Sequence, residues 1–205
     1  MFFEPLPPPA PESAATPALY YSSPGHEPEH WLPGLASLGI QLASTPTTSV
    51  FLTAWGSYPQ GLALVLRAQV SPTEPVVEPP SRQDRRPLVG GLRLGMLWSD
   101  GRSVEAENHW SRPRAKEGTF RLTPGSGGGG GIHWLWNLWL WPLPPAEPVT
   151  VYCMWEERGI AETSTNVDLA RVVAAAAEAT ELWPLPPPPP VPTDGGWLAF
   201  APLDR

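Results

Sequence analysis

The chain has 205 residues, including 30 prolines and 11 tryptophans, and its formal net charge is −7. Because charged residues make up only 16% of the chain and the net charge is negative, no basic surface is expected, and nucleic acid and anionic lipid are disfavoured as partners. The single cysteine, Cys153, excludes an intramolecular disulfide and a cysteine-based zinc site. In VTVYCMW it is expected to be a small buried side chain.

The first 36 residues are rich in Pro, Ala, Ser and Glu and show no helical or strand periodicity. We predict a disordered tail over 1–36, followed by a folded domain over 37–183. MFFEPLPPPAPE lacks the features of a signal peptide, and no apolar run approaches the ~20 residues of a membrane helix. These patterns predict a cytoplasmic protein without a membrane segment.

The folded domain is predicted to consist mainly of short strands. In GLALVLRAQV, Leu62, Leu64 and Leu66 alternate with other residues in the pattern typical of a half-buried strand. Asp100-Gly101 predicts a two-residue hairpin turn, whereas the proline- and charge-rich segment 71–87 predicts an exposed loop. The candidate strands are 38–43, 48–55, 61–70, 92–98, 102–108, 118–123, 132–141 and 147–157.

One helix is predicted, over about 166–183. Thr165 to Asp168 fits a capping box, LARVVAAAAEATELW continues with strong helix formers, and Pro184 ends the pattern. Leu169, Val172 and Trp183 share its apolar side. Strands joined by hairpins, with this one helix, predict an antiparallel β-sandwich of about 7–8 strands with a C-terminal helix.

The segment GGGGGIHWLWNLWLWPLPP has an unusual composition. Gly127–Gly131 is predicted to be a mobile hairpin loop, because the G-K-[ST] of a phosphate loop is absent and a strand follows. Ile132–Trp141 is predicted to be a strand that is apolar on both faces. We expect Trp134 and Trp136 to be buried in the core. Trp139 and Trp141 are the candidates for exposure, where they could bind a protein or stack on a sugar.

His26-Glu27-Pro28-Glu29-His30 matches the H-E-x-x-H pattern of zinc proteases. That chemistry needs both imidazoles on one face of a rigid helix, and Pro28 lies inside the motif. We interpret the match as coincidental and predict no metal site. No nucleophile elbow is present, and paired carboxylates such as Glu105 and Glu107 are expected to face water. The sequence therefore predicts no catalytic residues and no cofactor.

Residues 184–205 begin with a polyproline run, which predicts an extended arm. The arm carries an apolar cluster, Trp197, Leu198 and Phe200, that is the second candidate for partner binding.

The glycine run joined to LWLWPLPP is followed by a strand ending in Trp155, a turn over Gly159 to Thr163 and a predicted helix closing on LWP. On these features the chain resembles a group of functionally uncharacterised actinobacterial proteins. The resemblance spans roughly 38–184 and implies a bacterial, cytoplasmic protein. It implies no activity.

Two functional hypotheses follow. The first is a non-enzymatic module for binding a protein partner or for self-association, which uses Trp139, Trp141 and the C-terminal arm. The alternative is a carbohydrate-binding module or glycan-acting enzyme that uses the tryptophan-rich strand.

Overall fold

A computed structural model describes residues 26–37, 39–73, 88, 91–107 and 119–185. All of them except Leu185 belong to one unit of the chain, residues 22–184. The unit is mainly β, as the sequence predicts. The predicted tails over 1–25 and 186–205, and the 71–87 loop beyond Thr73, lie outside the described residues.

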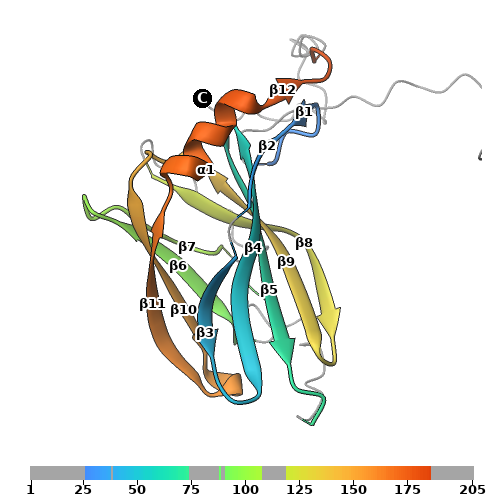
Figure 1. The fold of residues 1–205 in the computed structure, drawn as a ribbon, viewed down its shortest axis with the longest axis vertical. Helices are drawn as coiled ribbons and strands as arrows, with labels where there is room; N and C mark the ends of the chain where they lie inside the picture. The colour runs from blue at the N-terminus through green and yellow to red at the C-terminus, as the bar shows by residue number, and fades with distance from the viewer. Residues whose placement is uncertain (1–25, 38, 74–87, 89–90, 108–118, 186–205) are drawn as a thin grey trace, which may run out of the picture. The chain divides into compact units, whose positions relative to one another are not determined.

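The larger sheet has six antiparallel strands (Figure 1). Its order is β2-β4-β5-β9-β8, and β3 pairs with another part of β4. The strands are β2 (Gly34–Ala36), β3 (Ile40–Ser44), β4 (Thr48–Tyr58), β5 (Gly61–Val70), β8 (Arg121–Gly130) and β9 (His133–Trp141). β9 ends at Trp141 because Pro142, joined to it by a cis peptide bond, follows.

The second sheet has four antiparallel strands in the order β11-β10-β6-β7. They are β6 (Arg93–Trp98), β7 (Ser103–Glu105), β10 (Pro148–Trp155) and β11 (Ile160–Asp168), with a short 3₁₀ turn, η2 (Glu156–Arg158), between the last two. The predicted hairpin at Asp100-Gly101 is confirmed, but the predicted two-residue turn is wrong: three residues, Ser99 to Gly101, connect the hydrogen-bonded pair Trp98 and Arg102. Gly101 has a φ of 85°, and its N–H donates to the carbonyl of Trp98 over 3.0 Å.

Both sheets contribute side chains to one hydrophobic core. Leu62, Leu64 and Leu66 of β5 are fully buried, as their alternation predicts, and so are Leu94 and Met96 of β6. Burying a side chain of this size contributes about 1.5–3 kcal/mol to folding. Cys153, also predicted to be buried, lies in the same core.

The two sheets are joined along one edge, where Ala106 and Glu107, which follow β7, pair with the start of β8. The backbone N–H of Glu107 donates to the carbonyl of Leu122 over 2.8 Å. The Arg121 guanidinium donates two hydrogen bonds to the carboxylate of Glu107, at 2.8 and 2.7 Å. This bidentate geometry fixes both side chains. Near β3, the Thr163 hydroxyl of β11 donates to the carbonyl of Leu42 over 3.0 Å.

The predicted helix over 166–183 is wrong for most of its length. Thr165 to Val167 belong to β11, where Val167 is buried and pairs with Val149 of β10. Helix α1 spans only Ala170–Ala174, and the 3₁₀ turn η3 (Ala175–Glu178) follows it. Strand pairing and burial outweigh the local helical propensity of the sequence.

Helix α1 lies across one end of the sheets, beside β2 and β4 (Figure 1). Leu169 and Val172 are buried there, as predicted. The hydroxyl of Ser57, itself fully buried in β4, donates to the carbonyl of Val172 over 2.6 Å. The helix is therefore fixed to the end of β4 by both packing and a hydrogen bond.

The prediction of a mobile loop at Gly127–Gly131 is also wrong. β8 continues to Gly130 and pairs with β9, so the turn consists of Gly131, with a φ of 63°, and Ile132. A Cβ atom on Gly129 would lie 2.5 Å from the carbonyl oxygen of His133 and 3.0 Å from the indole of Trp134. Glycine lets this ring lie directly over the edge strand.

The folded unit begins before the predicted boundary at residue 37. β1 (Trp31–Leu32) pairs with β12 (Thr180–Glu181) in a separate two-stranded ribbon. The N–H of Leu182 donates to the carbonyl of His30 over 2.9 Å, which extends the pairing. The ribbon therefore ties the first described residues to the last ones.

Within the described ranges, the chain forms no helix that combines the length and the hydrophobicity needed to cross a bilayer.

Candidate functional site

The two faces of β9 have different environments. Trp134 and Trp136, each 3% exposed, point into the core, as predicted, and their rings stack with centroids 6.0 Å apart. The opposite face carries Leu135, Asn137, Trp139 and Trp141. The Asn137 amide donates to the Ser126 hydroxyl of β8 over 2.9 Å.

Trp139, one of the two candidates for exposure, is buried: its side chain is only 4% exposed. Its ring packs edge-to-face against Tyr58, with centroids 5.6 Å apart. It also covers Gly61, where an added Cβ would lie 2.8 Å from the indole. Trp141 is partly exposed. β9 therefore offers no open row of indoles on which a sugar could stack.

The H-E-x-x-H residues have structural contacts instead of the geometry of a zinc site. Residues 26–30 are not helical, and the carboxylate of Glu27 accepts a hydrogen bond from the Tyr58 hydroxyl at 2.5 Å. Nε2 of His30 accepts one from the indole N–H of Trp31 at 3.0 Å. Across the described part of the chain, no group of three His, Cys, Asp or Glu side chains is arranged to hold a metal ion.

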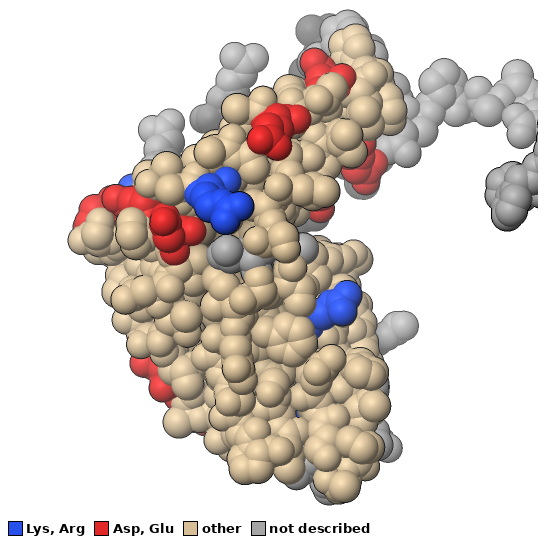
Figure 2. Space-filling model, in the orientation of Figure 1, with Lys and Arg blue, Asp and Glu red and all other residues tan. Residues whose placement is uncertain are grey.

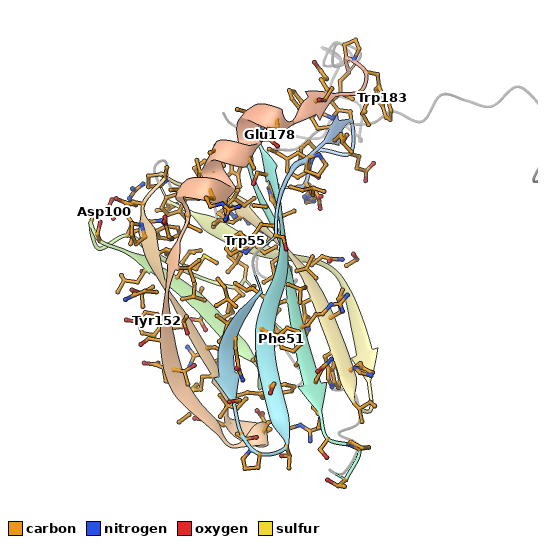
Figure 3. The ribbon with its side chains drawn as sticks, viewed as in Figure 1. Phe51, Trp55, Asp100, Tyr152, Glu178 and Trp183 are labelled. Atoms are coloured by element: carbon orange, nitrogen blue, oxygen red, sulfur yellow. The ribbon has the colours of Figure 1, made fainter. Side chains whose placement is uncertain are left out.

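The exposed indole lies on the ribbon. Trp183 follows β12 and is 55% exposed, and it is the only tryptophan among the described residues in the exposed class (Figure 3). Sequence reasoning placed it on the buried side of a helix, although the adjacent Pro184 indicated that a helix could not continue there.

Other large apolar side chains near the ribbon are also exposed: Leu32 is 58% exposed, Leu35 75% and Leu182 49%. The ribbon register pairs Leu32 with Thr180, and His30 faces Leu182, so Leu32 and Leu182 project from the same side of the ribbon. We call Leu32, Leu35, Leu182 and Trp183 the ribbon surface. It contains four of the six exposed large apolar side chains among the described residues.

Acidic side chains accompany the ribbon surface. Glu29 directly precedes the ribbon, Glu181 lies within β12, and Glu178 closes η3; all three are exposed. Figure 2 shows acidic side chains over the part of the surface formed by α1 and the ribbon. Three exposed carboxylates therefore lie in or close to the ribbon, and α1 also carries the exposed Arg171.

Reactive groups elsewhere in the described residues have structural surroundings. Burial in the core raises the pKa of the Cys153 thiol to about 12, which keeps it protonated and inert at neutral pH. The predicted paired carboxylates have separate cationic partners: Glu105 accepts from Arg93 at 2.8 Å, and Glu107 from Arg121. This arrangement does not resemble a pair of acids across a cleft.

The remaining candidates from the sequence, Trp197, Leu198 and Phe200, lie outside the described residues. Of the candidates within them, the structure brings Trp139 and Trp141 together on one face of β9 and leaves Trp141 the more exposed of the two.

Comparison of the chain with protein-family models, with curated proteins and with solved structures gives no match.

Proposed function

We propose that this protein is a non-enzymatic interaction module and that a protein partner docks on the ribbon surface. The observation that carries the proposal is that four exposed large apolar residues, Leu32, Leu35, Leu182 and Trp183, lie in one short ribbon or within three residues of it along the chain. Isolated exposed apolar residues are ordinary, whereas a cluster with polar residues around it is typical of an interface. Tryptophan is also enriched among the residues that dominate binding energy.

The charge around the ribbon surface favours one kind of partner. In a symmetric dimer through this surface, Glu29, Glu178 and Glu181 would meet acidic residues of the second copy, and like charges brought together at an interface are unfavourable. A partner with an apolar segment flanked by Lys or Arg would complement both the exposed apolar side chains and the nearby carboxylates. We therefore propose a heterologous partner of this chemistry.

The framework for this surface is, in our proposal, a β-sandwich. The support for it is that strands of the six-stranded and four-stranded sheets supply one continuous core. Sandwich folds hold their loops and edge elements on a rigid base, which suits a protein whose binding surface lies on a small appended ribbon.

The C-terminal arm extends the proposed docking region. Residues 184–205 follow Trp183 directly and carry Trp197, Leu198 and Phe200 after the polyproline run. A second apolar contact on the same chain would raise the affinity through effective concentration. A cytoplasmic location is part of the proposal, and cell fractionation checks it.

The partner is identified with a photoreactive phenylalanine analogue at position 183 of the full chain, expressed in the native host. The matched control carries it at position 132, because Ile132 is exposed but lies in the β8–β9 turn. We expect one discrete covalent product from position 183 and none from position 132. The purified partner should then bind the wild-type protein with an affinity that falls as salt is added.

The double variant Leu182→Ser with Trp183→Ser should weaken that binding by about tenfold or more, whereas Ile132→Ser should leave it unchanged. Deleting 184–205 should weaken it without changing the thermal unfolding of the domain. The proposal is wrong if position 183 gives no product or the same products as position 132. A covalent dimer of the chain itself would assign the surface to self-association and contradict a heterologous partner.

A further inference from the structure

The outer face of the four-stranded sheet has a groove that is separate from the ribbon surface. Its volume is about 300 Å³, and it is lined by residues of all four strands, β6, β7, β10 and β11. This volume is at the lower end of the ~300–1,000 Å³ range of small-molecule sites. The groove is shallow and more open than enclosed, so a ligand can enter without any movement of the sheet.

Gly95 forms the floor of the groove. It lies in the middle of β6, where Tyr152 of β10 and Glu105 of β7 are its cross-strand neighbours. Glycine inside a strand is unfavourable by about 0.5–1 kcal/mol relative to alanine, so its presence needs a reason.

The backbone at Gly95 does not require glycine. Its φ is not among the positive values found at Gly91, Gly101, Gly131 and Gly159. A Cβ atom there would meet only the carbonyl oxygen of Val104, at the ordinary distance of 3.4 Å. The missing side chain therefore leaves the groove open between Tyr152 and Glu105 without serving the fold.

The walls of the groove combine apolar and polar groups. Tyr152 lies on the side of β10 opposite the buried Val151 and Cys153, so its ring faces outward beside the floor (Figure 3). Met154 and Leu97 add apolar surface along the same face. An aromatic ring beside aliphatic side chains suits the C–H face of a sugar ring.

The charged groups of the groove are one guanidinium and two carboxylates: Arg93, Glu105 and Glu162. Nε of Arg93 donates to Glu105 over 2.8 Å, yet both side chains stay about half exposed, at 54% and 51%. The lining therefore has a net negative charge, which disfavours an anionic ligand, while the Arg93 guanidinium would repel a cationic ligand at the same rim. A neutral ligand with many hydroxyl groups can donate to the carboxylates and accept from Arg93.

We propose that the Gly95 groove binds a short neutral saccharide, with one sugar ring over Gly95 and against Tyr152 while Arg93, Glu105 and Glu162 hydrogen-bond its hydroxyls. This site differs from the tryptophan-rich strand on which the sequence suggested sugar binding, because the indoles of β9 are largely buried. It is also independent of the ribbon surface, so either proposal can fail without the other.

The full-length protein is titrated with a panel of neutral oligosaccharides: cello-, malto-, xylo-, manno- and chito-oligomers. A heparin fragment and an oligo-arginine peptide serve as anionic and cationic probes. Binding is measured by calorimetry, and the site is located by backbone amide chemical-shift changes. We expect at least one neutral oligomer to bind with a dissociation constant in the millimolar range or tighter, with shifts centred on Gly95 and Tyr152.

Two variants test the groove directly. Gly95→Leu fills it, and Tyr152→Ala removes its aromatic wall; each should weaken saccharide binding by about tenfold or more. The control is Thr150→Ala. Thr150 lies on the same face of the sheet outside the groove, where its hydroxyl donates a hydrogen bond to Asn166, and this variant should leave binding unchanged. Thermal unfolding of each variant identifies any loss of fold. If a variant does not fold, the location of the chemical-shift changes in the wild-type protein tests whether the saccharide binds in the groove.

The proposal is overturned if no neutral oligomer binds, or if binding survives in folded Gly95→Leu. Binding of oligo-arginine alone would assign the groove to a cationic peptide and overturn it as well, and so would shifts that lie away from Gly95.

Discussion

The hydroxyl of Tyr58, at the end of β4, donates a 2.5 Å hydrogen bond to Oε1 of Glu27, thirty-one residues earlier in the chain. The same tyrosine ring packs edge-to-face against Trp139. Burial, and then the bond to Glu27, raises the pKa of Tyr58, so the hydroxyl keeps its proton well into the alkaline range. Through these contacts the segment before β1 is fixed to the outer face of the six-stranded sheet.

We therefore predict that Tyr58→Phe loosens the segment around Glu27 while the sheet stays intact. The phenyl ring keeps the contact with Trp139, but the hydrogen bond to a carboxylate is lost, which should reduce stability by about 1–3 kcal/mol. Hydrogen exchange should show faster exchange at residues 26–31 and unchanged protection in β5. Equal loss of protection throughout the sheet would contradict this local role.

In the glycine run, alanine substitutions at the adjacent residues Gly129 and Gly128 should have different effects on stability. Alanine at Gly129 would place its Cβ 2.5 Å from the backbone of His133, whereas at Gly128 no atom lies within 4 Å. Gly129→Ala should therefore destabilise the protein by about 1–3 kcal/mol. Gly128→Ala should be neutral or stabilise it by up to about 1 kcal/mol, because alanine restricts the unfolded chain. Urea unfolding of the two variants measures the difference, and equal midpoints would show that β8 does not pair as described.

The two arginine–glutamate pairs should differ in their contribution to stability. Arg121 and Glu107 are only 22% and 14% exposed and join the sheets, whereas Arg93 and Glu105 are 54% and 51% exposed. Glu107→Gln should reduce stability by about 1–3 kcal/mol, because it leaves a largely buried guanidinium without its counter-ion. Glu105→Gln should change it by no more than about 0.5 kcal/mol. Thermal unfolding at low and high salt checks both, and a larger effect at Glu105 would contradict the predicted order.

Because Cys153 is buried, we predict that the folded protein loses stability at alkaline pH. Its pKa in the folded protein is about 12, against an ordinary value of 9.0 for an exposed thiol. Above pH 9.0 the unfolded chain loses this proton while the folded chain keeps it, so rising pH favours unfolding. The stability that the protonated Cys153 thiol contributes to the folded protein is fully present below pH 9.0 and is lost by about pH 12.

The Cys153→Ala variant should accordingly show a shallower decline of unfolding free energy above pH 9.0 than the wild-type protein. Chemical unfolding at a series of pH values measures the two slopes. In the native wild-type protein at neutral pH, a thiol reagent should react with Cys153 only as fast as the protein unfolds. Rapid labelling, or parallel pH profiles, would show that the thiol is accessible in the folded state.

Where one face of a strand is buried, the sequence predicted the structure well. The alternation in Gly61–Val70 matches the burial pattern of β5, and a hairpin forms at Asp100-Gly101, where Gly101 has the positive φ that glycine allows. These patterns are local, because each depends only on which residues alternate or on the φ that glycine allows.

The errors have causes that lie elsewhere in the chain. Val167 is part of a strand because Val149 pairs with it, and Gly129 is part of a strand because Trp134 covers it. Trp139 is buried by Tyr58, more than eighty residues earlier in the sequence. A single sequence gives the propensity of each residue but not the partner that overrides it. For the same reason the sequence did not point to Gly95, because its role depends on the space between Tyr152 and Glu105, and only the structure shows that these residues are its cross-strand neighbours.

The ribbon also determines how the folded unit can be rearranged. His30 and Leu182 are hydrogen-bonded at 2.9 Å, so a peptide of a few residues can join the segment before β1 to the segment after β12. A circular permutant that is closed there and opened at the exposed Asp100-Gly101 turn keeps every strand pairing except the tip of one hairpin. By the same geometry, the unit can be inserted into a surface loop of a host protein without forcing the two ends of that loop apart.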